Sequence, residues 1–418
     1  MRRGGASALF GIELRRLRQQ HGLSLRDLSR VVGFTPGYLS KVENGRSPSA
    51  ELARACDDTL VAGGALLAMA NAEPAVRPAQ LPAGIRRFVG RDDQLERLDT
   101  AGARVVIIDG PPGAGKTMLA LHWAHHAVDR FPDGQLYVDL RGHCADDRPM
   151  DARVALDEFL AALGVPADGI PDSLELGSAL YRSMLADRKM LVVLDNAADA
   201  AQVRPLLPAA AGCVAVVTSR GRLPRIAASR VTLGPMTPAD SVALIRRVIG
   251  DERADREPAA VADLAARCDY LPLALRIAAE RVVAQPHSLV RDLVEELDAD
   301  GRLNVLSTYD SIALRTVFDW SYRRLDEGCA RMFRLLGLHR ESHIDPGAAA
   351  ALAGVTEPVA HLLLDRLAGV HLVQKVGDRY RLHGLLREYA ADPRESRVRS
   401  RRSLDRGLSS IESVHRSS

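Results

Sequence analysis

A glycine-rich segment has the residue types and spacing of a phosphate-binding loop. It matches the pattern G-x-x-x-x-G-K-[ST] in full with Gly110, Pro111, Pro112, Gly113, Ala114, Gly115, Lys116 and Thr117. Glycines let main-chain N–H groups wrap closely around phosphate oxygens. Lys116 supplies a charge for the β- and γ-phosphates, and Thr117 supplies an oxygen ligand for Mg²⁺. Met118 follows at the start of a helix, whose dipole favours anions. We therefore predict that this loop binds a purine nucleotide, ATP or ADP, with Mg²⁺.

A carboxylate at the end of an apolar run completes the predicted magnesium site. Asp195 follows the apolar residues 190–194, which is the pattern of a Walker B element. Asn196 comes next, where many related ATPases have the acid that activates water. Because an amide cannot accept that proton, we expect hydrolysis to be slow or to use another group. Arg220 ends a later apolar run and is a candidate sensor of the γ-phosphate; the alternative is a solvated arginine.

Short apolar runs alternate with helical stretches and would position these groups. The runs are 105–109, 136–140, 190–195, 214–219 and 231–233. Runs rich in Val, Ile and Leu are typical of strands buried on both faces of a parallel sheet. We therefore predict a multidomain protein whose residues 88–236 form an α/β P-loop NTPase domain with a parallel sheet.

The rest of the C-terminal half divides by pattern. Residues 237–306 are helical with no strand signal, which predicts a helical domain. Residues 307–391 place helices before a hairpin, an order that predicts a winged-helix domain. We expect a proline-containing linker at 73–87 and a disordered Arg- and Ser-rich tail at 392–418.

The N-terminal residues 1–72 are predicted to form an all-α helix-turn-helix domain. Two short helical patterns flank a glycine turn, and the second begins at Thr35-Pro36, which suits a capped helix start. Residues 1–60 carry ten Arg or Lys against six Asp or Glu, an excess that supports binding to phosphates. The alternative is a helical adaptor that touches only protein.

The second of these two helices, in the N-terminal domain of residues 1–72 (the head), would enter the major groove of double-stranded DNA. Its apolar residues Leu39 and Val42 are expected to face the core. The side chains expected to contact bases or phosphates are Thr35, Tyr38, Ser40 and Lys41.

Composition limits the setting in which the chain acts. The net charge is only +3, and no apolar run approaches the length of a membrane span. The basic N-terminus lacks the apolar segment of a signal peptide. The five cysteines form no CxxC pair, so neither a zinc site nor a disulfide framework is indicated. We expect a cytoplasmic protein with no membrane partner.

Several motifs occur in a fixed order between residues 86 and 390. They are Phe88-Val-Gly-Arg91, the P-loop, Leu136-Tyr-Val-Asp-Leu-Arg141, Leu191-Val-Val-Leu-Asp195, Thr218-Ser-Arg220, Leu271-Pro-Leu-Ala-Leu275 and Leu382-His-Gly-Leu-Leu-Arg387. This order closely resembles the NB-ARC class of STAND ATPases, as found in actinobacterial transcriptional regulators. The string from Tyr38 to Ser49 is similar to the repressor-like (XRE or Cro/CI) helix-turn-helix family. The resemblance implies a P-loop sheet domain, a helical domain and a winged helix in that order.

The resemblance also implies roles for residues outside the P-loop. Val89, Gly90 and Arg91 would lie near the adenine and ribose. Pro272 would cover the base, and His383 would reach the β-phosphate of ADP and lock a closed state; taken alone, His383 is a candidate core histidine. Two residues depart from the family pattern: Tyr270 replaces a glycine, and Gly384 replaces an aspartate whose loss could loosen the lock.

These features together predict a DNA-binding transcriptional regulator switched by ADP and ATP. ADP would hold the domains closed, and exchange for ATP would allow self-association of the chain. Clustering of several heads would then raise the avidity for DNA. Two alternatives remain open: a P-loop ATPase enzyme with a DNA-targeting head, and an interaction scaffold with a vestigial nucleotide switch.

Overall fold

The chain folds into two compact units, which are described separately. In the computed structural model, one unit contains Met1–Pro78 with Leu160–Ile170, and the other contains Ala79–Phe159 with Pro171–Ser418. The division after Pro78 falls inside the predicted linker at 73–87. The described residues are 5–44, 46, 48–71, 77–84, 88–144, 148–307, 314–339 and 341–392. Most of the predicted tail, at 393–418, therefore lies outside them, as do parts of the linker.

The head is all-α, as predicted. Its helices are α1 (Gly5–Gln20), α2 (Leu25–Val32), α3 (Pro36–Glu43), α4 (Ala50–Thr59) and α5 (Ala65–Asn71). Ser24 and Asp27 form a reciprocal capping box at the start of α2, and Gly33 ends that helix in the left-handed conformation. Leu39 and Val42 are fully buried among the other helices, which confirms the predicted core face of α3.

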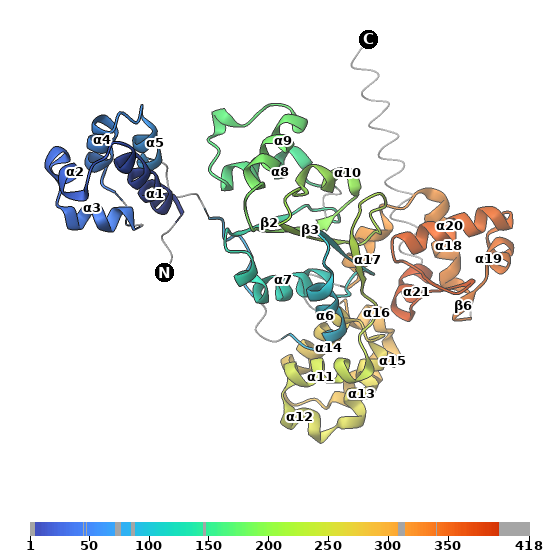
Figure 1. Cartoon of the computed structure of the whole chain (residues 1–418). Helices are drawn as coiled ribbons and strands as arrows, with labels where there is room; N and C mark the ends of the chain where they lie inside the picture. Colours follow the sequence, from blue (N-terminus) through green and yellow to red (C-terminus); the bar gives the residue numbers. More distant parts are fainter. Residues whose placement is uncertain are drawn as a thin grey trace, which may run out of the picture. The chain divides into compact units, whose positions relative to one another are not determined.

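The second unit contains a five-stranded parallel sheet, of which Figure 1 labels the strands β2 and β3. Its strands are β1 (Val105–Asp109), β2 (Gln135–Asp139), β3 (Leu191–Ala197), β4 (Val214–Ser219) and β5 (Ser229–Thr232). Their order is β2-β3-β4-β1-β5, and all four pairings are parallel. Parallel strands end at one edge, so the P-loop after β1 lies beside the ends of β3 and β4.

Helices and short 3₁₀ turns precede and connect these strands. They are α6 (Asp92–Thr100), α7 (Lys116–His126), η1 (Val128–Arg130), α8 (Ala152–Ala162), η2 (Ala167–Gly169), α9 (Leu174–Leu185), α10 (Ala200–Val203) and η3 (Arg204–Leu206). Helix α7 packs across β1, β3 and β4, and its Leu119 and Trp123 share a core with Val106 and Val193. We call β1–β5 with α6, α7, α9 and α10 the P-loop domain.

A helical domain follows the sheet, as the sequence predicted. It contains α11 (Pro238–Ile249), α12 (Asp251–Arg256), α13 (Pro258–Arg267), α14 (Pro272–Ala284), α15 (Val290–Asp300) and α16 (Arg302–Val305). Three of these helices begin with proline, whose missing N–H is no loss in the first turn.

The predicted winged-helix domain is confirmed in the remaining elements. They are α17 (Leu314–Tyr322), α18 (Glu327–Leu338), β6 (His343–Ile344), α19 (Pro346–Ala353), α20 (Glu357–Gly369), β7 (Gln374–Val376), β8 (Arg379–Arg381) and α21 (Gly384–Ala391). The predicted hairpin is β7 with β8, and β6 adds a third antiparallel strand that the sequence did not indicate. Two residues are too few to give an alternating pattern.

Within the described ranges, no single helix has the length and apolar character needed to cross a membrane. Helices α19 and α20 pass a test of length and composition only as a pair, and that pair is bent by 104°.

Candidate nucleotide pocket and DNA-binding helix

A cavity of about 570 Å³ lies at the P-loop edge of the sheet. Small-molecule sites commonly have volumes of about 300–1,000 Å³. Its walls come from the P-loop domain, from Pro272, Leu273 and Arg276 of α14, and from Val317 and Trp320 of α17. All three domains of the second unit therefore contribute to one cavity.

The P-loop is held by contacts within the protein. Gly115 adopts a left-handed conformation (φ 87°) at the start of α7, and Lys116 Nζ donates to the carbonyls of Gly110 and Pro111 at 2.8 Å each. The N–H of Leu273 donates to Gly113 O at 3.2 Å, so the helical domain contacts the loop directly. Burial and the charge of Arg220 lower the pKa of Lys116 to about 7. An ammonium group in this position gains strongly from an anionic ligand.

Oxygen donors suited to Mg²⁺ lie together beside the loop. Asp195 is 6% exposed, and its Oδ1 accepts hydrogen bonds from Thr117 Oγ1 at 2.8 Å and Thr218 Oγ1 at 2.5 Å. Tyr137 donates to the other carboxylate oxygen at 3.3 Å. Burial raises the pKa of Asp195, although these hydroxyl groups oppose the rise. Hydroxyl and carboxylate oxygens are ligands that Mg²⁺ takes in nucleotide sites, so Thr117 and Asp195 fit the predicted metal.

Arg220 joins the end of β4 to the first helix of the winged-helix domain. Its Nη1 donates to Val317 O at 2.7 Å and to Ser321 Oγ at 2.8 Å. Its guanidinium also lies 5.8 Å from the centroid of the Trp320 ring. Burial lowers the pKa of Arg220 to about 10. The side chain lines the cavity, and this arginine is thus engaged with protein rather than simply solvated.

The structure brings most of the predicted nucleotide-site residues to the cavity wall. Those in the wall are Val89, Arg91, Gly113, Ala114, Gly115, Lys116, Thr117, Met118, Asp195, Arg220 and Pro272. Arg91 donates to Gly234 O at 2.7 Å, and burial lowers its pKa. The nucleotide contacts themselves stay predictions.

Other predicted residues lie outside the described wall. They are Gly90, Gly110, Pro111, Pro112 and His383. His383 directly precedes α21, where burial lowers its pKa and nearby Asp269 of the helical domain opposes that effect. The wall gives no support to a phosphate contact by His383, and that role stays a prediction.

Sequence reasoning missed several wall residues. Trp320 and Val317 come from α17, about two hundred positions along the chain from Lys116, and no motif spacing links them. His143 follows β2 in a loop without a motif. The rarity of tryptophan could have drawn attention to Trp320, because the chain has only two tryptophans.

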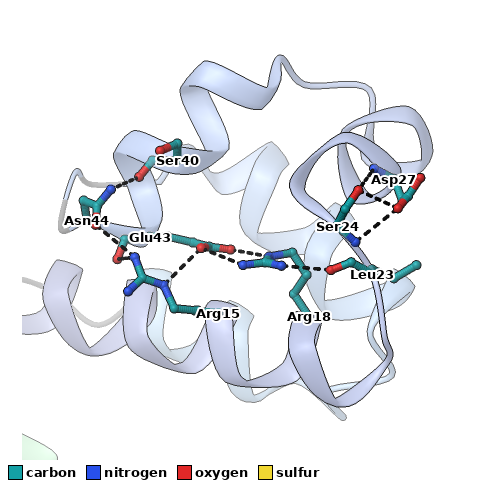
Figure 2. A network of polar contacts seen from close by, with 8 residues as sticks. All are labelled: Arg15, Arg18, Leu23, Ser24, Asp27, Ser40, Glu43 and Asn44. Atoms are coloured by element: carbon teal, nitrogen blue, oxygen red, sulfur yellow. Dashed lines mark hydrogen bonds and ion pairs between the residues drawn. The ribbon is translucent and has the colours of Figure 1, made fainter.

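In the head, a buried carboxylate ties the end of α3 to α1. Figure 2 shows Arg15 and Arg18 of α1 converging on Glu43, with shortest distances of 3.1 Å and 2.6 Å respectively. The Glu43 side chain is only 2% exposed. Arg15 also donates to Asn44 Oδ1 at 2.9 Å, and Asn44 donates back to Ser40 O. This network fixes the angle at which α3 is presented.

The four predicted DNA-contacting residues all lie on or beside α3. Thr35 caps the helix and accepts from the N–H of Tyr38 at 3.3 Å. Tyr38 is half-buried, and its hydroxyl accepts from the N–H of Ser49 at 3.2 Å. Ser40 is partly exposed and Lys41 is exposed. Contact of these side chains with DNA stays a prediction.

Comparison with known proteins identifies the two functional modules. A helix-turn-helix domain model matches residues 9–69, and an AAA domain model matches residues 99–208. The chain thus contains a helix-turn-helix domain and a P-loop domain that matches the AAA model, and the predicted helix-turn-helix head and P-loop NTPase domain are confirmed. A P-loop domain of this kind implies that a nucleotide binds.

The chain is also similar to named regulators. It is 43% identical over 342 residues to the regulatory protein AfsR of Streptomyces coelicolor, a match that covers 78% of this chain and 34% of AfsR. It is 42% identical over 363 residues to AfsR of Streptomyces griseus, covering 83% of this chain and 37% of that protein. The chain therefore spans about a third of the length of these curated relatives.

A solved structure shares the fold of much of the chain. The Walker-type ATPase PABY2304 of Pyrococcus abyssi aligns with a TM-score of 0.52 at 12% identity, covering 75% of this chain and 99% of that one. At this identity the likeness concerns fold alone.

Proposed function

We propose that this chain is a transcriptional regulator in which bound ADP or ATP controls DNA binding. The observation that carries the proposal is the cavity lined by the P-loop, α14 and α17. A ligand that fills this cavity touches three domains at once. Its phosphate content can therefore alter how those domains contact one another.

Arg220 is the residue through which ADP and ATP would differ. Its guanidinium is bound to Val317 and Ser321 of α17 and also faces the cavity. A γ-phosphate offers it a charge-assisted bond, which is stronger than bonds to a neutral carbonyl or hydroxyl. Binding of ATP would draw Arg220 from α17 and loosen the winged-helix domain, whereas ADP would leave these contacts in place.

Mg²⁺ would be held by Thr117 and Asp195, and it would neutralise charge on the phosphates. Their oxygen atoms lie 2.8 Å apart as a hydrogen-bonded pair. Asn196 gives no carboxylate for activating water, which supports a long-lived ATP state and a switch rather than rapid turnover.

The output would be binding of double-stranded DNA through α3. The similarity to AfsR, described as a regulatory protein, supports a regulatory role, and the helix-turn-helix match supports one that acts on DNA. Self-association of the ATP form would bring several heads together. Linked heads bind DNA with higher avidity than one head alone.

The experiment is selection of DNA from a random pool by the full chain, with Mg²⁺ and either ADP or a non-hydrolysable ATP analogue. We expect enrichment of a common sequence to differ between the two nucleotides, and Lys116→Ala to remove the difference. Equal enrichment in the apo, ADP and analogue forms would contradict nucleotide control. Enrichment of no sequence would contradict the role of the head.

A further inference from the structure

The cavity wall contains a histidine, His143, that the proposed switch does not use. His143 lines the cavity and is 9% exposed, and its Nδ1 atom is buried with no hydrogen-bond partner among the described residues. Buried polar atoms in folded proteins are nearly always paired, so the unpaired nitrogen of a residue in the cavity wall calls for an explanation.

The loop that carries His143 is clasped by Asn196. The side-chain amide of Asn196 accepts from the N–H of His143 and donates to its carbonyl, both at 3.2 Å. The N–H of Gly142 donates to Asn196 O at 2.6 Å. A Cβ at Gly142 would lie 2.4 Å from that oxygen, so only glycine allows this approach. Asn196 therefore holds the backbone of the loop from Gly142 to His143 in place.

Backbone strain occurs at the same contact between Asn196 and the loop that carries His143. Arg141 and Asn196 both adopt the left-handed conformation, with φ values of 50° and 54°. Non-glycine residues in that region cost free energy and are concentrated at functional sites. The strain occurs on both sides of the contact, at the edge of the cavity.

The charges around His143 define the ligand chemistry. Burial, Arg220, Arg324 and Lys116 together lower the pKa of His143 to about 2, so the ring is neutral at physiological pH. A neutral ring carries one N–H donor and one acceptor nitrogen. His143 lines the cavity together with Lys116 and Arg220, and an N–H donor of its ring suits an anionic oxygen bound there.

We propose that His143 is a nucleotide-contacting residue that donates a hydrogen bond to the third phosphate of ATP. The inference rests on the proposed function and adds to it a residue that distinguishes a triphosphate from a diphosphate. Lys116 and Asp195 fix the β/γ end of the nucleotide, and His143 lies in the same wall.

The position of His143 also connects the third phosphate to the winged-helix domain. Arg324, between α17 and α18, donates a hydrogen bond to the carbonyl of Gly142, the residue before His143. Movement of the His143 ring toward a bound phosphate would therefore shift the loop that contains Gly142. That loop is bonded to Arg324 of the winged-helix domain.

The test measures equilibrium binding of ADP and of a non-hydrolysable ATP analogue, with Mg²⁺, to the full chain. His143→Ala is expected to weaken binding of the analogue about tenfold, the effect of losing a hydrogen bond to a charged group. The affinity for ADP is expected to change less than about threefold, because ADP lacks the bonded group. His287→Ala, at an exposed histidine of the helical domain, is the matched control and should change neither affinity.

His143→Gln keeps an N–H donor and should recover part of the analogue affinity, which separates bonding from misfolding. Equal weakening of both nucleotides by His143→Ala, or no weakening of either, would overturn the inference while leaving the proposed function standing. If the wild-type chain binds neither nucleotide, the proposed function fails and the inference fails with it.

Discussion

The polar residues of the cavity already bond to one another. Lys116 donates to the carbonyls of its own loop, and Asp195 accepts from Thr117 and Thr218. A nucleotide with Mg²⁺ would replace these bonds rather than add to an empty surface. The net affinity is then the difference between two sets of bonds, which is smaller than a count of new contacts suggests.

Glu43 is the residue whose charge matters most to the head. We expect Glu43→Gln to destabilise α1 and α3 by about 2 kcal/mol, because Arg15 and Arg18 lose their shared carboxylate. Hydrogen exchange of amides in both helices of the full chain measures the loss. Glu51→Gln, at an exposed position of α4, should have little effect. Unchanged protection in the Glu43 variant would show that the network contributes nothing to the head.

At the scale of elements, helix α3 is the expected DNA-contacting surface. We expect Lys41→Ala to weaken DNA binding by about tenfold and to reduce the slope of log affinity against log salt by about one, because one phosphate contact is lost. Affinity for a selected DNA, titrated at several salt concentrations, measures both quantities. Lys189→Ala removes an exposed lysine from the P-loop domain and serves as the control. An unchanged salt slope in the Lys41 variant would mean that this lysine touches no phosphate.

A second contact between elements joins β1 to the winged-helix domain. Asp109 is 1% exposed, and its carboxylate lies 3.6 Å from His371 Nε2 and 3.7 Å from Arg230 Nη1. The N–H of Arg222 also donates to Gly369 O at 3.1 Å. The segment after α20 therefore meets the P-loop sheet at an almost fully buried charge.

We expect Asp109→Asn to weaken this docking, because the amide lacks the negative charge that faces His371 and Arg230. Hydrogen exchange in residues 367–373 of the nucleotide-free chain should become faster by about tenfold, the effect of losing about 1.4 kcal/mol. Asp129→Asn, at an exposed position, is the control. Protection that stays at the wild-type level would mean that the buried charge does not hold the two domains together.

Much of the element order followed from the sequence for a clear reason. The strands of the parallel sheet are buried on both faces, so their apolar runs stand out from the surrounding pattern. The run at 105–109 coincides with β1, and the run at 136–140 differs from β2 by one residue. The sequence could not indicate β6, because two residues form no recognisable pattern and their partners in β8 are distant in the chain.

The candidate site was predictable where it follows a local motif. Lys116, Thr117 and Asp195 lie on elements with fixed spacing, and the structure brings them together. His143 and Trp320 could not be found in this way. Their places in the wall depend on how separate loops and domains pack, which no local pattern records.

At the scale of the whole molecule, the account makes one claim: a phosphate change at one cavity alters binding of DNA by the head. The contacts that would carry the change begin at Arg220 and continue through α17. Such coupling requires that ADP and ATP bind two conformations unequally.

The most direct test is the affinity of the full chain for a selected DNA, measured with Mg²⁺ and either ADP or a non-hydrolysable ATP analogue. We expect tighter binding with the analogue by about fivefold or more, the lower range of typical coupling between sites. The Lys116→Ala variant should bind DNA with the same affinity under both conditions. Identical affinities for the wild-type chain with the two nucleotides, both shown to be bound, would contradict the account.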